Sequence, residues 1–153
     1  MTDIAYAKKW AETRQNDLAA HRELYAAAED FVIEGRKVND HLGDTISTDA
    51  EFEQDLALWT DGRQSMTVTE AFAGNGHLMI HWDYTVDADT YRGLPTDGKT
   101  LSSKGSTFLQ FDANGKIILE STFVNENPLF QQLGLPIITP HYWEEGFDPS
   151  SLG

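Results

Sequence analysis

Hydrophobic and polar positions divide the chain into a helical first part and a sheet-forming second part. Residues 4–14 are rich in Ala, Lys, Trp and Glu, which favour helix. A second helix is expected through Leu18, Leu24 and Tyr25 after a cap at Asn16. The apolar residues 31–33 are β-branched or aromatic and are followed by polar residues, which indicates a short strand.

A third helix is expected before the sheet begins. Thr48 is followed three residues later by Glu51, which is the capping-box pattern. Phe52, Leu56 and Trp59 then recur at helical spacing and share one face. The helix is expected to end at residues 61–62, where glycine tolerates the left-handed conformation.

Residues 65–126 predict an antiparallel meander. Asn75-Gly76 and Asn114-Gly115 each separate two strand-like runs, and Asn-Gly favours the tight turns of paired strands. Residues 93–99 form a turn-rich connection between the two hairpins. Residues 128–153 begin with an apolar turn, contain several prolines and are expected to wrap the surface. Helices followed by such a sheet predict an α+β domain.

The central strand of this sheet alternates between two kinds of side chain. The more apolar set is expected to face the helices, and comprises Leu78, Ile80, Trp82 and Tyr84. The other set is expected to form the outer face, and comprises His77, Met79, His81 and Asp83. His81 and Asp83 have a spacing that can hold a metal, but no third ligand is evident, so no metal site is expected.

Composition narrows the class of protein. The chain has 153 residues, a formal charge of −14 and no cysteine. A chain this acidic repels phosphate backbones and anionic membranes, so neither nucleic acid nor membrane is an expected partner. No apolar run is long enough to span a bilayer, and the first residues do not resemble a signal peptide. We expect one cytoplasmic domain over 1–153, helical over about 1–62, with its sheet over about 65–126.

The second half resembles a known family. Residues 112–117, Asp-Ala-Asn-Gly-Lys-Ile, lead without a gap to Gln131-Gln132-Leu133-Gly134-Leu135. This resembles the C-terminal signature of SnoaL-like polyketide cyclases, members of the nuclear-transport-factor-2-like superfamily that includes ketosteroid isomerases. The loop at 93–99 resembles the family's Gly-x-Pro-Pro-Thr-Gly-Lys loop, and Trp82 falls where the family often has a Trp on its central strand.

The resemblance implies a cone-like α+β barrel, with N-terminal helices packed in a strongly bent antiparallel sheet around one deep pocket. It also implies a homodimer and chemistry on a hydrophobic, carbonyl-bearing small molecule, polyketide-like or steroid-like, without a cofactor. Fold likeness alone does not decide function, because the superfamily hosts both enzymes and non-catalytic binding modules.

One departure from the family concerns the acid/base residue. The gapless alignment puts Asn125 where the family has a carboxylate, and an amide cannot transfer a proton at neutral pH. Asn125 can instead donate a hydrogen bond to a developing oxyanion. Glu126 is one residue further on and would face the opposite side of an ideal strand unless a bulge turns it.

Other candidate catalytic residues lie upstream. Glu34 falls in the region where ketosteroid isomerases carry an acidic base, and the alternative is an exposed strand charge. His41, in a polar loop with Asp44, can act as a base at neutral pH, and the alternative is a solvated loop histidine. Tyr25 or Tyr6 can donate a phenolic hydrogen bond to a substrate oxygen.

The candidate ligand-binding residues are aromatic. They comprise Trp82, Tyr84, Trp59 and Tyr25, whose flat faces suit a flat ligand, and the alternative is ordinary core packing. Two functions therefore stay open: a cofactor-free cyclase or isomerase, and a non-catalytic binding or interaction module of the same fold. The outer face of the sheet, with His77, His81 and Asp83, is the candidate dimer contact.

Overall fold

The computed structural model describes residues 3–27, 30–37, 44–46, 50, 53–54, 57, 59, 63–135, 145–148 and 150. Side chains are described for all of these except residues 33–37 and 44–46. His41 and the capping pair Thr48 and Glu51 lie outside the described residues, as does the side chain of Glu34.

Two helices open the chain, as the sequence predicts. Helix α1 spans Asp3–Asn16 and helix α2 spans Leu18–Arg22. The prediction that the second helix runs through Leu24 and Tyr25 is wrong, because Tyr25 instead forms a parallel bridge with Ile117. The cap of α2 is Asp17, whose side chain accepts a hydrogen bond from the Ala20 amide, so the prediction of Asn16 as the cap is wrong. The described residues of the expected third helix are helical, and they are Ala50, Glu53, Gln54, Ala57 and Trp59.

The sheet has six strands in the order β2-β1-β8-β7-β4-β3. Their bounds are β1 Val32–Lys37, β2 Asp44–Ile46, β3 Gln64–Gly74, β4 His77–Val86, β7 Leu101–Phe111 and β8 Ile117–Val124. All neighbours pair antiparallel except β1 and β8, which run parallel. The short strands β5 (Thr90–Tyr91) and β6 (Leu94–Pro95) form a separate hairpin.

Both predicted hairpins are confirmed. Asn75 and Gly76 have φ of 53° and 76°, the left-handed values that a two-residue turn between twisted strands requires. In the second hairpin Gly115 has φ of 75°. There the Asp112 side chain accepts hydrogen bonds from the amides of Asn114 and Lys116 at 2.8 Å each.

Three local expectations need correction. Asp44 begins strand β2 instead of lying in a loop, because its backbone pairs with Gly35. The expected short strand at 31–33 continues through polar residues to Lys37, because β8 supplies a full parallel partner. The C-terminal part begins with a helix, α4 (Asn127–Gln132), and not with a turn; Pro128 suits its first turn.

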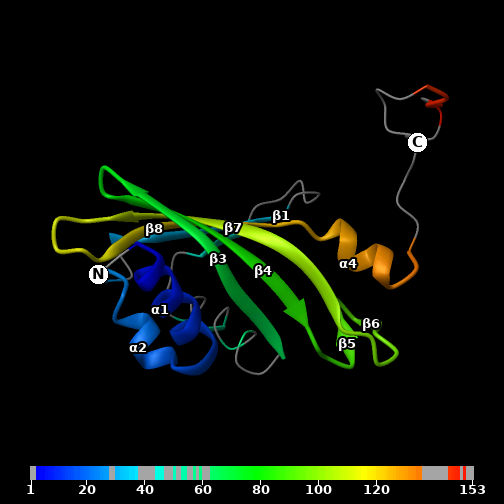
Figure 1. Cartoon of the computed structure of the whole chain (residues 1–153), viewed down its shortest axis with the longest axis horizontal. Coiled ribbons are helices and arrows are strands. Elements are labelled where there is room, and N and C mark those ends of the chain that lie inside the picture. The colour runs from blue at the N-terminus through cyan, green and yellow to red at the C-terminus, as the bar shows by residue number, and fades with distance from the viewer. Residues whose placement is uncertain are drawn as a thin grey trace.

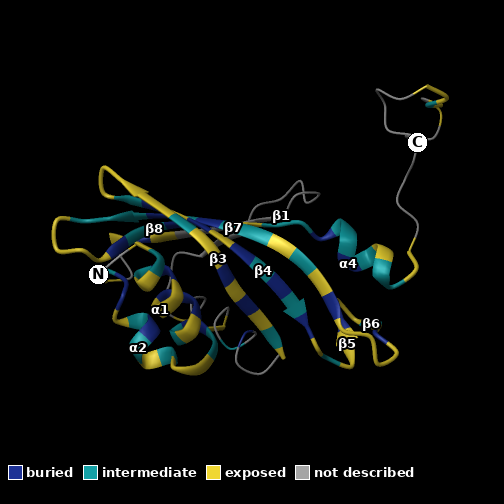
Figure 2. Cartoon of the chain, in the orientation of Figure 1, coloured by how far each residue is buried: buried dark blue, intermediate teal, exposed yellow. Residues whose placement is uncertain are grey.

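The bent sheet holds α1 and α2 against one half of its inner face, and α4 lies at the other end with the β5–β6 hairpin (Figure 1). The alternation predicted for β4 is confirmed by burial, which is dark along every second residue in Figure 2. Leu78, Ile80, Trp82 and Tyr84 are at most 4% exposed, whereas Met79 is 36% exposed.

Gly105 on β7 lets Trp82 lie directly on the inner face of the sheet. A Cβ built at Gly105 would lie 2.3 Å from Trp82 Cη2 and 2.4 Å from Cζ2. Real side chains do not approach this closely, so a glycine is required where the indole crosses β7. The position of Trp82 therefore depends on the absence of a side chain at residue 105.

We predict that Gly105→Ala lowers the free energy of unfolding by about 2 kcal/mol, because the added methyl displaces a ring packed into a dense core. Chemical denaturation monitored by tryptophan fluorescence measures this. Gly74→Ala is the matched control, since nothing lies within 4 Å of a Cβ at Gly74. Equal losses in the two variants would contradict the close-contact interpretation.

Candidate active site

A buried ion pair joins the helices to the inner face of the sheet. Arg14, in the last turn of α1, lies 3.2 Å from Glu120 of β8, measured from Nη1 to Oε1. Arg14 is 3% exposed and Glu120 is 0% exposed. Two charges removed from water this completely need each other, because either one alone would cost several kcal/mol to bury.

Tyr25 and His21 extend this pair into a network. The Tyr25 hydroxyl donates a hydrogen bond to Glu120 Oε2 and accepts one of 3.0 Å from the indole nitrogen of Trp10. His21 Nε2 lies 3.2 Å from the same hydroxyl, and His21 Nδ1 lies 2.9 Å from Thr13 Oγ1. Trp10 of α1 and His21 of α2 are therefore connected through the Tyr25 hydroxyl to the carboxylate of Glu120.

Burial decides the protonation of this network. Desolvation, together with the nearby charge of Arg14, lowers the pKa of His21 from 6.5 to about 2, so the imidazole is neutral. Desolvation and the Glu120 charge raise the pKa of Tyr25 well above its ordinary value, so the phenol keeps its proton. His21 and Tyr25 therefore add no charge beside the Arg14–Glu120 pair.

An aromatic cluster lies beside this network. The Trp59 ring centroid is 6.3 Å from that of Trp82 and 5.6 Å from that of Tyr84. Trp82 and Tyr84 meet edge to face at 6.0 Å. The Arg14 guanidinium lies 5.0 Å from the Trp59 ring centroid, within the range of a cation–π contact.

A second carboxylate, Glu126, lies beyond the end of β8. Its Oε1 accepts a hydrogen bond from the Tyr91 hydroxyl and lies 3.1 Å from Nε and 3.0 Å from Nη2 of Arg92. Both partners come from the β5–β6 hairpin. The Glu126 side chain is 10% exposed, and its Oε2 accepts no hydrogen bond from any residue that the structure describes.

Tyr84 links Glu126 to the aromatic cluster. Desolvation and the negative charge of Glu126 raise the pKa of Tyr84, so this phenol stays protonated. Its hydroxyl donates to Gln64 Oε1 at 2.8 Å. Tyr91 is held in the same way, with its pKa raised by burial and by its hydrogen bond to Glu126. The second carboxylate thus stands beside two neutral phenols.

Asn125 directly follows β8 and directly precedes Glu126. Its backbone N–H donates a hydrogen bond to the Lys104 carbonyl at 3.1 Å, and its backbone carbonyl accepts one from Ser103 Oγ. Its side-chain Oδ1 is buried and has no hydrogen-bond partner among the described residues. A buried polar oxygen without a partner is costly in a protein interior.

The structure brings together several of the residues singled out from the sequence. Trp59, Trp82 and Tyr84 form one aromatic cluster, and Tyr84 is next to Glu126. Tyr25 is joined to Glu120 instead, by the hydroxyl proton that was expected to meet a substrate oxygen. The backbone of Glu34 lies on β1 beside Ser121, and His41 lies outside the described residues.

Sequence reasoning missed Arg14, Glu120, Tyr91 and Arg92. Arg14 resembles an ordinary basic residue in the last turn of a helix, and Glu120 is one of 25 acidic residues. One signal was available for Glu120: a charge placed within an otherwise apolar and hydroxylic strand, in the inward register of Thr122. Tyr91 and Arg92 belong to a turn and carry no pattern that marks them.

In the part of the chain that the structure describes, no group of three or more His, Asp or Glu side chains is arranged to hold a metal ion. The helices described there include none with the length and apolar character that crossing a bilayer requires.

Comparison with solved structures shows close agreement in shape at low sequence identity. IdmH from Streptomyces antibioticus, a candidate polyketide cyclase, has a TM-score of 0.71 at 15% identity, over 88% of this chain and 100% of that one. A candidate SnoaL-like polyketide cyclase from Jannaschia sp. CCS1 has a TM-score of 0.67 at 13% identity, over 88% and 93%. A protein with a ketosteroid isomerase-like fold from Catenulispora acidiphila has a TM-score of 0.66 at 18% identity, over 88% and 96%.

The chain has the SnoaL-like, ketosteroid isomerase-like fold. This confirms the α+β cone expected from the sequence, with N-terminal helices packed against a strongly bent sheet. By sequence, no protein-family model and no curated protein matches the chain. At these identities the likeness concerns the SnoaL-like fold, and function has to be argued from the side chains.

The buried His21 predicts an acid-sensitive stability. Its pKa is 6.5 when unfolded and about 2 when folded, so between these values only the unfolded chain binds this proton. Stability therefore falls as the pH drops below 6.5, by about 1.4 kcal/mol per pH unit from this group. Urea unfolding measured at several pH values between 6.5 and 5 gives the free energy of unfolding at each. In His21→Gln this free energy should depend less steeply on pH than in the wild type.

The control for this measurement is Leu109→Ala, which removes buried side-chain volume but no titrating group. Its stability should be lower than that of the wild type at every pH, with an unchanged slope. A His21→Gln slope equal to the wild-type slope would contradict the neutral, buried state of this histidine.

Proposed function

We propose that this protein binds a flat, hydrophobic, carbonyl-bearing small molecule against the inner face of its sheet and moves a proton on that molecule. Polyketide-like and steroid-like ketones have the required shape and chemistry. The names of the proteins that share the fold support this substrate class: two are candidate polyketide cyclases and one has a ketosteroid isomerase-like fold.

The observation that carries the proposal is the arrangement of Glu126. One of its oxygens is anchored by Tyr91 and Arg92, and the other is not taken up by any described residue. A base needs such a free oxygen, held in a fixed direction, next to the place where the reacting carbon lies. Tyr84, Trp59 and Trp82 form an aromatic cluster beside it that is at most 9% exposed, and the proposed ligand would bind against this cluster.

The chemistry follows from these groups. Glu126 Oε2 would take a proton from a carbon next to the ligand's carbonyl, which leaves an enolate. The enolate oxygen needs a hydrogen-bond donor, and the Asn125 amide is the proposed one. The same proton returned to a different carbon completes an isomerisation. In an aldol-type ring closure the enolate carbon attacks a second carbonyl, and the alkoxide formed takes the proton back from Glu126.

Glu34 and His41 stay alternative bases within this proposal. Substitution of each in the assay below decides between them and Glu126, because only loss of the true base removes proton transfer while binding persists.

A non-catalytic binding module is the second candidate function. Two observations favour it: the position of the family acid holds Asn125, and Glu126 is already engaged in an ion pair with Arg92. In that case the aromatic cluster would bind a ligand that leaves unchanged.

We predict that the protein accelerates the exchange of α-carbon protons of 2-tetralone with deuterium in heavy water, measured by proton NMR. Exchange reports proton abstraction directly and needs no knowledge of the natural product. Glu126→Gln should lower the catalysed rate at least about 100-fold, which is a typical contribution of a general base. Glu70→Gln, an exposed carboxylate on β3, is the matched control and should keep the wild-type rate.

The other outcomes of this exchange assay distinguish the remaining possibilities. Full exchange in Glu126→Gln would exclude Glu126 as the base and direct attention to Glu34 and His41. A thermal shift with 2-tetralone but no exchange above buffer in the wild type would favour the binding module. If the protein neither binds any flat ketone nor accelerates exchange in one, the proposed ligand class is overturned.

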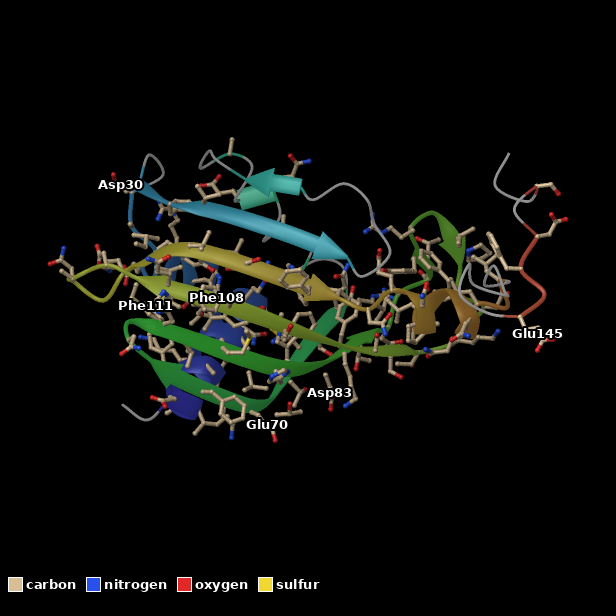
Figure 3. All side chains as sticks on the ribbon, turned by 90° about the horizontal axis from the view of Figure 1, so that it is seen from above. Asp30, Glu70, Asp83, Phe108, Phe111 and Glu145 are labelled. Carbon is tan, nitrogen blue, oxygen red and sulfur yellow. The ribbon has the colours of Figure 1, made fainter. Side chains whose placement is uncertain are left out.

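We also propose that two copies of the chain associate through the outer face of the sheet. Phe72, Met79 and Phe108 are in direct cross-strand register there, and Phe72 is 59% exposed. Phe123 on β8 adds a further exposed apolar side chain. Figure 3 views this face, with α1 behind the sheet, and labels Phe108 with the flanking Glu70 and Asp83. An exposed aromatic band of this kind is typical of an interface.

We predict a dimer at micromolar concentration by size-exclusion chromatography with light scattering, and a monomer for Phe72→Glu, because two carboxylates would be buried without partners. Ala5→Glu places the same charge on the exposed side of α1 and should leave the dimer intact. A wild-type monomer would refute the proposed association.

A further inference from the structure

A chain of hydrogen bonds runs from the aromatic cluster to the buried carboxylate of β8. The Trp82 indole nitrogen donates to Thr107 Oγ1 at 3.0 Å, and Thr107 Oγ1 lies 3.0 Å from Thr122 Oγ1. Thr122 Oγ1 donates in turn to Glu120 Oε1 at 3.0 Å. Thr107 and Glu120 are 0% exposed, so no water competes for these groups.

The chemistry of the two ends sets the direction of every bond in this chain. An ionised carboxylate only accepts and an indole N–H only donates, whereas each threonine hydroxyl has a single proton. The Thr122 proton therefore points to Glu120, and the Thr107 proton points to Thr122. The lone pairs of Thr107 are left for the indole of Trp82. The N–H of Trp82 and the hydroxyls of Thr107 and Thr122 thus all point along the series of hydrogen bonds toward Glu120.

We propose that Glu120 is a positioning residue for the ligand-binding surface: its charge orients the hydroxyls of Thr122 and Thr107 and thereby engages the indole N–H of Trp82. A bound ligand then meets Trp82 as a purely apolar ring with no hydrogen to donate. The statement about the hydroxyls concerns the protein alone. The statement about the ligand rests on the proposed function.

Arg14 explains why the carboxylate can act in this way. It lies on the same Oε1 that Thr122 reaches, at 3.2 Å, and its positive charge stabilises negative charge on that buried oxygen. Tyr25 occupies the other carboxylate oxygen. Glu120, at which the series of hydrogen bonds ends, therefore has the Arg14 guanidinium on one oxygen and the Tyr25 phenol on the other. Hydrogen bonds that end on such a charge strengthen one another.

The selectivity that follows is specific. The end of a ligand that lies at Trp82 should be hydrocarbon, because an oxygen placed there would lose water and gain no donor. The carbonyl should lie toward Glu126, which is at the other end of the aromatic cluster next to Tyr84. We therefore infer a ligand with its polar group at one end only.

Indole N–H signals in a ¹⁵N-correlated NMR spectrum test the positioning role without any ligand. The chain has 4 tryptophans, and Trp82→Phe identifies the signal of residue 82. Thr107→Val, which removes the acceptor but keeps the shape, should move this signal upfield and speed its exchange with solvent by about 10-fold or more. Thr107→Ser should restore both.

Thr122→Val is the decisive variant, because Thr122 bonds to Thr107 and Glu120 and not to the indole. It should move the Trp82 signal in the same direction as Thr107→Val while leaving the Arg14–Glu120 pair in place, and Thr122→Ser should not. Glu120→Gln combined with Arg14→Met removes both charges together and should have the same effect. An unmoved Trp82 signal in Thr122→Val would overturn the proposal.

The ligand arm compares 2-tetralone with 6-methoxy-2-tetralone, which carries a second oxygen at the far end. In the wild type the methoxy group should not improve the dissociation constant. In Thr107→Val the freed indole N–H should improve it about 3- to 10-fold, the value of one hydrogen bond. An equal preference in both proteins would overturn the inferred selectivity. Failure of both ketones to bind the wild type would count against the proposed function, and the NMR result would stand.

Discussion

The burial of Arg14 and Glu120 against each other is the constraint on which this fold depends. Neither charge can be left in the interior alone, so the last turn of α1 and the middle of β8 have to meet. These residues are 106 positions apart. Their contact closes the helical layer over the sheet, and it fixes which side of β8 faces inward. Tyr25, three residues after α2, then bonds to the same carboxylate and to His21 of α2.

The same constraint separates the charge of the surface from that of the interior. The chain carries a net charge of −14, yet each buried carboxylate described here is matched by an arginine. Glu120 is matched by Arg14 in the interior, where both side chains are at most 4% exposed, whereas Glu126 is matched by Arg92, whose side chain is 45% exposed. The inner pair therefore suits a structural and orienting role, whereas in the outer pair Glu126 Oε2 accepts no hydrogen bond from the described residues.

Local order was predictable from the sequence because it depends on neighbouring residues. The Asn75-Gly76 turn and the alternation along β4 follow from backbone sterics and from the two-residue period of a strand, and both are observed. The family resemblance in the second half of the chain predicted the cone. The parallel pairing of β1 with β8 was not predictable, because it joins segments 87 positions apart through backbone groups that carry no side-chain pattern. Glu120 was missed for a related reason: its meaning comes from Arg14, which no local pattern connects to it.

The strand period also decides how the departure at Asn125 should be interpreted. Glu120 and Thr122 face inward, and Val124 pairs with Gly105 on the same side. The bond from the Asn125 amide to Lys104 continues the ladder one residue beyond the strand. The next inward position is therefore residue 126, where a carboxylate stands. The family alignment puts Asn125 at the acid position, and the next residue, Glu126, places a carboxylate near Tyr84 of the aromatic cluster. The hairpin that carries Tyr91 and Arg92 then becomes part of the site, because without it this carboxylate would have no fixed direction.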